Sequence, residues 1–170
     1  MELPEELAGQ GFSLQDAEKS DLKDYIGVKR ICYTRYVDEY YGGWIENIQI
    51  KMNTDSFEEM LGRTCVKKVL FGKKPVGFFS YHEGEDKIDG ISIQLIDEAR
   101  NKGVGSFYLR FVTGLSDKTG KPVYLKVFQS NPAKDLYRRF GFRIYSKTAA
   151  HYLMRYDPAK PEQEKGDGAL

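Results

Sequence analysis

Apolar residues recur at steps of three and four positions from Leu22 to Tyr40, which is the spacing of one helix face. This pattern predicts a long helix, with Ser20 as its N-cap and Gly42-Gly43 as its end. The stretch "NTDSFEEML" predicts a second, shorter helix, with capping residues at Asn53 to Asp55. Ahead of both helices, Phe12 to Leu14 could form a short strand.

The pattern then changes to segments rich in β-branched and aromatic residues, which are typical of strands. These segments are Thr64–Phe71, Pro75–His82 and Lys87–Ile96. The short connections "GKK" and "EGED" between them are typical of hairpin turns. The three segments are therefore predicted to form an antiparallel meander.

The second half of the chain predicts a strand–helix–strand crossover. A helix is expected from Gly103 to about Asp117, a strand over Pro122–Phe128 and a helix over Pro132–Phe140, followed by the strands "FRIYSK" and "AHYLMRY". The fold class is thus α+β, with a mixed, mostly antiparallel central sheet flanked by helices. Residues 1–157 are predicted to be one domain, and the polar segment 158–170, which has no periodicity, to be a disordered tail.

Composition narrows the range of partners. The chain has 170 residues, 41% hydrophobic and 30% charged, with a net charge of +1, as expected for one soluble globular domain. So small a net charge gives no broad attraction to nucleic acid or to an anionic membrane, and we expect neither partner. No signal peptide and no apolar stretch of about 20 residues is found, so a cytoplasmic location is the default expectation. Cys32 and Cys65 are expected to be free thiols, and no metal-ligand spacing occurs.

The segment "RNKGVG", Arg100 to Gly105, connects the third strand of the meander to the next helix. Its glycines let the backbone bend sharply and approach a ligand closely. The first amides of a helix have no intrahelical acceptor, and the helix dipole adds about half a positive charge there. The turn therefore predicts a phosphate or pyrophosphate site. The alternative is a plain tight turn in which Arg100 and Lys102 are solvated.

Two other phosphate-binding loops are disfavoured. The turn lacks the Gly-Lys-Ser/Thr of a Walker loop, and it lacks the third glycine and the parallel βαβ unit of a dinucleotide fingerprint. A general nucleotide-binding protein is therefore not expected.

A second segment, "SNPAKDLYRRFGF", follows one strand downstream. Asn131 is a suitable N-cap and Pro132 suits the first helical position. Tyr137 lies on one face of the predicted helix, which Gly141 ends. A short helix is thus well specified by local sequence.

Together the two segments resemble the signatures of the GNAT superfamily of N-acetyltransferases. "RNKGVG" is similar to the R/Q-x-x-G-x-G/A turn, and Leu136 to Phe142 is similar to the closing Leu-Tyr-x-x-x-Gly-Phe. The order of elements also matches, and the resemblance covers Gly11 to Tyr156. It departs at one point: Asn131 lies six rather than seven residues before Tyr137, with Ser130 at the usual place. Which of Ser130 and Asn131 contacts the cofactor stays open.

The resemblance implies that acetyl-coenzyme A (acetyl-CoA) binds in the split between "ISIQLI" and "PVYLKVF", with its pantetheine arm along the first of these strands. Backbone amides of the turn would hold the diphosphate, supplemented by the Arg100 and Lys102 side chains. The implied cofactor residues are Gln94, Leu95, Ile96, Arg100, Lys102, Gly103, Val104, Gly105, Ser106, and Ser130 or Asn131.

The resemblance also implies transfer of an acetyl group from a thioester to an amine. Tyr137 is the expected general acid for the departing thiolate; the alternative is a core tyrosine packed on the sheet. Asp89, eleven residues before Arg100, is the expected base, and alternation places it on the face of Ile91 and Leu95. The alternatives are a solvated hairpin aspartate and a base made of a water chain. Further candidates for the base are His82, Glu83 and His151.

An aromatic and acidic cluster near the end of the first long helix could bind the amine acceptor, because aromatic faces and carboxylates suit a cation. The proposed acceptor residues are Tyr33, Tyr36, Trp44 and Glu46, and the cluster also contains Tyr40, Tyr41, Asp38 and Glu39. The alternatives are that the same side chains pack in the core or form a homodimer interface. The acceptor is expected to be a small-molecule or protein amine. The alternative function is a non-catalytic acyl-CoA-binding sensor or interaction module.

Overall fold

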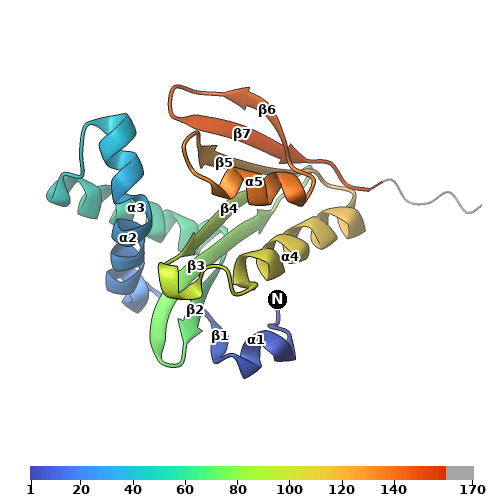
Figure 1. Cartoon of the computed structure of the whole chain (residues 1–170), viewed down its shortest axis with the longest axis horizontal. Coiled ribbons are helices and arrows are strands. Elements are labelled where there is room, and N and C mark those ends of the chain that lie inside the picture. Colours follow the sequence, from blue (N-terminus) through green and yellow to red (C-terminus); the bar gives the residue numbers. More distant parts are fainter. Residues whose placement is uncertain (160–170) are drawn as a thin grey trace, which may run out of the picture.

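Seven strands form one sheet in the order β1-β2-β3-β4-β5-β7-β6 in a computed structural model that describes residues 1–159 (Figure 1). The strands are β1 (Phe12–Asp16), β2 (Cys65–Phe71), β3 (Lys74–Glu83), β4 (Ile88–Leu95), β5 (Val123–Phe128), β6 (Arg143–Lys147) and β7 (His151–Tyr156). The helices are α1 (Glu5–Gly9), α2 (Leu22–Tyr41), α3 (Glu46–Arg63), α4 (Val104–Thr119) and α5 (Ala133–Arg139). This arrangement confirms the predicted α+β class.

The sheet is mostly antiparallel, as predicted, and β4–β5 is the parallel pair among the described strands. That pair is joined at one register position, Ile88 with Val123, where the Ile88 amide donates to the Pro122 carbonyl at 2.8 Å. Beyond it the two strands separate. The sheet is therefore split along the rest of β4.

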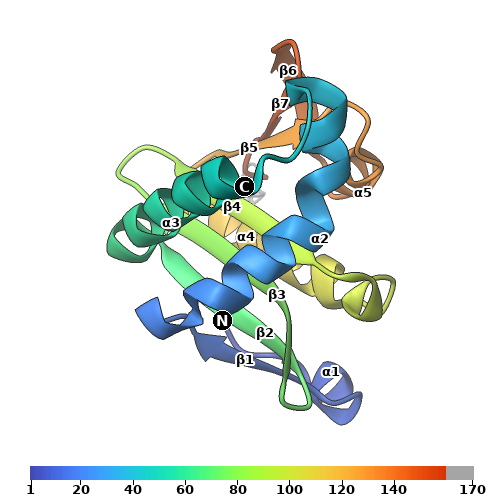
Figure 2. The same ribbon diagram turned by 90° about the vertical axis from the view of Figure 1, so that its left-hand side faces the viewer.

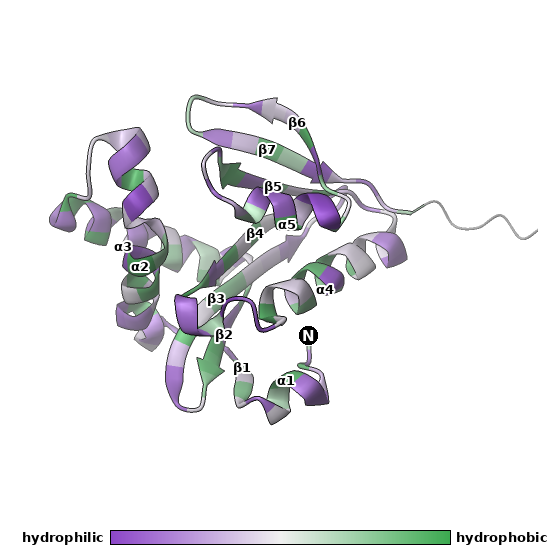
Figure 3. Cartoon of the chain, viewed as in Figure 1, coloured by the Kyte–Doolittle hydropathy of each residue, from purple (hydrophilic) through white to green (hydrophobic). Residues whose placement is uncertain are grey.

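Helices cover both faces of the sheet, α2 and α3 on one and α4 on the other (Figures 1 and 2). Tyr25 of α2 stacks on Phe57 of α3 at 4.4 Å between ring centroids and meets the edge of Phe78. Tyr108 of α4 stacks on Phe79 at 4.5 Å. Because successive strand side chains point to opposite faces, the neighbours Phe78 and Phe79 anchor the two helical layers. Apolar colouring follows β3 and β4 between them, whereas α5 is largely hydrophilic (Figure 3).

The start of α2 differs from the prediction. A short 3₁₀ turn, Lys19–Asp21, precedes it, and a reciprocal capping box joins Glu18 and Asp21 instead of a cap at Ser20. This capping box replaces the predicted Ser20 cap because the carboxylates of Glu18 and Asp21 each accept a hydrogen bond from the other residue's backbone amide. Gly42 ends the helix as predicted, in a left-handed conformation with φ of 80°.

The predicted start of the second helix is wrong. Helix α3 begins at Glu46, so that Asn53 and Thr54 are interior residues and not caps. Their side chains instead bond back to carbonyls one turn earlier, Asn53 Nδ2 to Gln49 at 2.8 Å and Thr54 Oγ1 to Ile50 at 2.8 Å. This back-bonding allows capping-type residues to sit inside a helix.

Four further observations complete the description of the fold. Helix α1, which no sequence pattern predicted, buries Leu7 in the core. Cys32 and Cys65 are free thiols, as predicted. The predicted tail, 158–170, lies outside the described residues from 160 onward. Within residues 1–159, none of the helices has the length and apolar character needed to span a membrane.

Candidate active site

The split between β4 and β5 opens into a cavity of about 1560 Å³. The amide of Ile96 donates to Val76 in β3, and backbone groups alternate in direction along a strand. The main-chain groups of Ile93 and Leu95 consequently face away from β3 and toward the gap. The exposed strand edge suits an extended ligand that makes strand-like hydrogen bonds.

The turn before α4 presents free backbone donors. Gly103 has φ of 91° and Asn101 has φ of 56°, both left-handed. The first intrahelical bond runs from the Phe107 amide to the Gly103 carbonyl, and none of the amides of residues 101–106 has an acceptor within residues 1–159. These amides and the helix dipole form a site for a phosphate or diphosphate.

The glycine at position 105 brings the turn close to its neighbours. A β carbon there would lie 3.7 Å from Leu95 Cδ1 and 3.8 Å from Leu136 Cδ2. The start of α4 therefore lies between the end of β4 and helix α5. The two segments that carry the sequence signatures meet at this point.

The side chains of Arg100 and Lys102 were expected to supplement the diphosphate site, but both make other contacts. Arg100 Nε donates to the Leu95 carbonyl at 2.8 Å, and its Nη1 donates to Asp97 at 2.8 Å. The Nζ of Lys102 lies 6.0 Å from the ring centroid of Phe71, beside β2. Arg100 therefore fixes the end of β4, and the backbone amides are the main hydrogen-bond donors left for an anion.

Tyr137, from α5, lines the cavity and is buried. Its hydroxyl has no hydrogen-bond partner among residues 1–159, while Phe142 packs beside the ring at 6.1 Å between centroids. Burial, with a smaller contribution from nearby Tyr36, raises the pKa of the Tyr137 phenol. The hydroxyl is therefore protonated at neutral pH and free to donate.

Asp89 lies on the opposite face of the sheet from the one predicted. The register between β3 and β4 shifts between Ser80 and His82, so strict alternation fails, and Asp89 pairs with His82. Gly90, with φ of 63°, provides the extra residue. This places the Asp89 carboxylate with His82 on the face covered by α2 and α3, where it lines the cavity.

Two cationic or donor groups contact the Asp89 carboxylate. His82 Nδ1 lies 2.9 Å from one oxygen and Lys87 Nζ lies 3.3 Å from the other. Burial acts to raise the pKa of Asp89, but the hydrogen bonds from His82 and Lys87 outweigh it and hold that pKa below its usual value. Asp89 is therefore ionised throughout the neutral range.

Ser130 and Asn131 have different roles in the structure. Ser130 Oγ donates to Glu39 at 2.6 Å, and its amide donates to the Tyr40 hydroxyl at 3.0 Å. Asn131 Oδ1 accepts from the Ala133 amide at 2.9 Å, which satisfies a free donor at the start of α5. Asn131 lines the cavity and Ser130 ties α2 to the β5–α5 connection.

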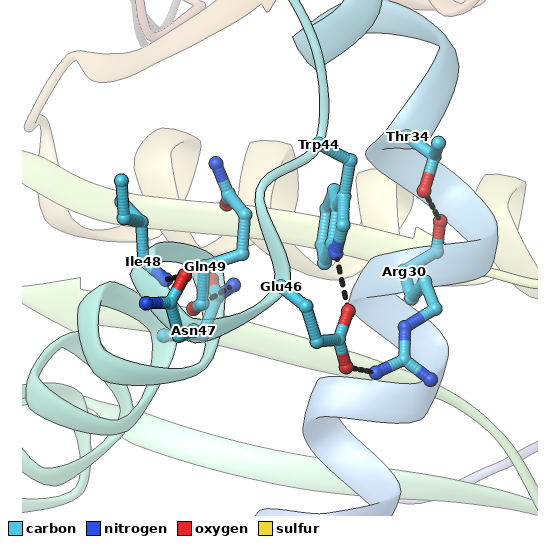
Figure 4. Close-up of polar contacts among 8 residues, drawn as sticks. Arg30, Thr34, Trp44, Glu46, Asn47, Ile48 and Gln49 are labelled. Atoms are coloured by element: carbon cyan, nitrogen blue, oxygen red, sulfur yellow. Dashed lines mark hydrogen bonds and ion pairs between the residues drawn. The ribbon is translucent and has the colours of Figure 1, made fainter.

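The predicted acidic acceptor residue is already paired (Figure 4). Glu46 accepts from the Trp44 indole Nε1 at 2.8 Å through one oxygen and forms an ion pair with Arg30 through the other. The Trp44 amide also donates to Asp38 Oδ1 at 2.9 Å. These contacts fix the connection from α2 to α3 at the mouth of the cavity and leave Glu46 no free oxygen for a cation.

The tyrosines of the same cluster pack within the chain. Tyr36 stacks on Phe128 at 5.0 Å between ring centroids and Tyr40 at 5.5 Å, while Tyr33 lies at 6.1 Å. Tyr33 and Tyr36 also line the cavity. The rings therefore pack between α2 and β5, and those of Tyr33 and Tyr36 also form part of the cavity wall.

The structure brings most of the predicted site residues into one cavity. Those that line it are Tyr33, Tyr36, Trp44, Asp89, Leu95, Arg100, Gly103, Gly105, Ser106, Asn131 and Tyr137. Those outside its lining are Glu46, Gln94, Ile96, Lys102, Val104 and Ser130. Gln94 is buried on the α2 side, where its Nε2 donates to Ser92 Oγ at 3.1 Å.

One wall of the cavity was missed by the sequence prediction. Ile45, Ile48 and Met52, from the first half of α3 and its approach, are 55%, 48% and 59% exposed and line the mouth. Their spacing of three and four residues is a helical signal that could have located the start of α3. Lys29 of α2 was missed as well.

The sheet split, the free amides and the two signature helices define the GNAT type of acetyltransferase fold. The model of the acetyltransferase (GNAT) family matches residues 30–142, and the chain belongs to that family. Its cofactor is acetyl-CoA, and the unpaired amides at the start of α4 fit the diphosphate of that cofactor. No curated protein matches the chain in sequence.

Solved structures share the fold at low identity. PaiA N-acetyltransferase from Thermoplasma acidophilum, in complex with coenzyme A, is 17% identical with a TM-score of 0.67, covering 86% of this chain and 98% of its own. Ribosomal-protein-S18-alanine N-acetyltransferase from Escherichia coli is 17% identical with a TM-score of 0.64, covering 94% and 99%. An acetyltransferase from Thermus thermophilus is 18% identical with a TM-score of 0.64, covering 86% and 96%.

Proposed function

We propose that this chain is an acetyl-CoA-dependent N-acetyltransferase that moves the acetyl group directly to a primary amine. One observation carries the proposal: the free amides before α4 and the free hydroxyl of Tyr137 open into the same cavity. The bound cofactor supplies an acetyl thioester, whose carbonyl carbon the amine attacks. Transfer of the acetyl group would leave an amide on the acceptor and the free thiol on the cofactor.

The chain's own residues would share this work. Amides of the turn, among them those of Gly103 and Gly105, hold the diphosphate, and the edge of β4, at the Ile93 main chain and the Leu95 amide, aligns the extended arm. Tyr137 donates a proton to the departing thiolate. Asp89, on the α2 and α3 face, is positioned to accept a proton from the amine side.

The function is tested by acetylation of an amine panel, monitored by release of free thiol. An acetyltransferase releases thiol only in the presence of a suitable amine. Coenzyme A binding with no thiol release on small amines and peptide amines alike would instead indicate the acyl-CoA-binding module. We also propose that residues 1–157 act as a single catalytic domain, because the described strands join one sheet.

Replacement of Gly103 by valine is expected to weaken coenzyme A binding by roughly 10-fold, because an L side chain is strained at φ of 91° by about 1–2 kcal/mol. Isothermal titration with coenzyme A measures the change. Gly114→Val is the matched control, since Gly114 lies within α4, the helix that follows the turn, and nothing surrounds its position within 4 Å. Equal affinity in the Gly103 variant and the control would remove the diphosphate from this turn.

Replacement of Asp89 by asparagine is expected to lower kcat/KM by roughly 10- to 100-fold from about pH 6 to about pH 8, because the ionised carboxylate is lost as a proton acceptor. Steady-state rates over that range measure it. Asp86→Asn, an exposed aspartate of the same hairpin, is the control. A pH–rate profile that Asp89→Asn leaves unaltered would assign the proton to a water chain.

A further inference from the structure

Lys29 is a cation without a counter-ion in the cavity wall. It lies on α2 one turn before Tyr33, and its Nζ is 4.8 Å from the Tyr33 ring centroid and 5.7 Å from that of Tyr25. Within residues 1–159 it has neither a hydrogen bond nor a carboxylate within 4.0 Å. The two aromatic faces supply the remaining stabilisation of its charge.

The carboxylates of the cavity are all engaged elsewhere. The pairs that involve its lining residues are Glu59 with Arg63 at 3.8 Å, Asp89 with Lys87 at 3.3 Å and Asp135 with Arg138 at 3.0 Å. Glu46, at the mouth, is held by Arg30 and Trp44. Each carboxylate that lines the described cavity thus has a cationic neighbour. Among the lining cations, Lys29, Lys126 and Arg139 have no carboxylate partner within residues 1–159; Lys126 and Arg139 are exposed, whereas Lys29 is half-buried beside two aromatic rings.

Burial destabilises the charged form of Lys29. Loss of hydration lowers the pKa of Lys29 to about 8, although nearby Cys32 acts in the opposite direction. A negative group beside Nζ would offset that cost, since a charge-assisted hydrogen bond is stronger in a cavity of low dielectric than in water.

Lys29 lies on the same side of the sheet as the candidate base. Helix α2 covers the face of the sheet opposite α4 (Figure 2), and Lys29 of that helix lines the cavity. The same helix also meets the start of the diphosphate turn, where Arg100 Nη2 lies 4.0 Å from Cys32 Sγ. Asp89, the candidate base, lies on this same face. The amine to be acetylated would enter between them.

We propose that Lys29 binds an anionic group of the acceptor, a carboxylate or a phosphate, so that the substrate is an amine that also carries negative charge. This inference rests on the acetyltransferase function proposed above. It differs from the expectation, drawn from Glu46 and the aromatic cluster, that the site suits a cationic amine.

Matched pairs of amines test the proposal: an amino acid against its amide, and phosphoethanolamine against ethanolamine. The wild-type protein is expected to prefer the anionic member of at least one pair, which also distinguishes carboxylate from phosphate. Lys29→Met should reduce kcat/KM for that member by about 10- to 100-fold more than for its neutral partner. Lys29→Arg should restore most of the preference, and Lys23→Met, on the exposed side of α2, should leave it unchanged.

Three results would overturn the proposal: preference of the wild-type protein for the neutral member of both pairs, equal loss on both members in Lys29→Met, and a matching loss of coenzyme A affinity in that variant. A second readout does not depend on turnover. With coenzyme A bound, N-acetylglycine but not N-acetylglycinamide should protect Lys29 from reductive methylation, mapped by mass spectrometry. If no amine is acetylated, the proposed function fails, and protection of Lys29 by the anion still decides the present inference.

Discussion

Tyr137→Phe is expected to lower kcat by about 100-fold or more while coenzyme A affinity changes by less than about 2-fold. The phenol is buried in the cavity wall, its hydroxyl has no protein partner among residues 1–159, and burial raises its pKa, so that it is protonated when the thiolate departs. Phenylalanine retains the ring that packs on Phe142 and removes only the donor. Single-turnover thiol release and calorimetric titration with coenzyme A measure the two quantities.

The matched control for this loss is Tyr156→Phe. Its hydroxyl donates to Asp117 at 2.9 Å on the surface, so the same chemical change is made outside the cavity. Turnover close to wild type is expected there. If Tyr137→Phe also turned over at the wild-type rate on a true acceptor, the hydroxyl would have no part in the reaction, and its place beside the gap would be explained by packing alone.

The elements that the sequence predicted well are those in which local chemistry and tertiary packing agree. The strands of the meander have β-branched and aromatic residues that also fill the core, as Phe78 and Phe79 do on the two faces. The turn before α4 needs a left-handed residue, and glycine at 103 meets that need from sequence alone. Both predictions depend on local sequence alone, and tertiary packing in the structure agrees with both.

The elements that it missed depend on contacts between distant residues. The face of Asp89 follows from a register shift between β3 and β4, which no count of alternation along one strand can include. Glu46 is removed from the acceptor site by Arg30, sixteen residues earlier on α2. Lys29 stands out because folding half-buries it in the cavity wall without a carboxylate partner among the described residues. The conformation of the turn before α4 was thus predictable, whereas the pairing of the proposed acceptor residues required the structure.

Gly77, in β3, is another position whose role depends on contacts with residues distant in the sequence. It lies beside the end of β4 that leads to the proposed cofactor site. A β carbon at this position would overlap the carbonyl oxygen of Gln94 and lie 2.6 Å from Leu95 Cδ2. The register pairs Gly77 with Leu95, at the end of β4 that leads into the diphosphate turn. Only the absence of a side chain lets β3 and β4 approach so closely here.

Gly77→Ala is therefore expected to destabilise the protein by about 3 kcal/mol, because the overlap is with backbone and cannot be relieved by a rotamer change. The shift of β4 should also raise KM for acetyl-CoA, through displacement of Leu95 and the Arg100 side chain bonded to its carbonyl. Urea unfolding and steady-state kinetics measure the two effects. Gly27→Ala, within α2 with nothing inside 4 Å, should instead stabilise by up to about 1 kcal/mol. Equal stability of the two alanine variants would mean that β3 and β4 can separate at little cost, and that the end of β4 does not set the geometry of the cofactor turn.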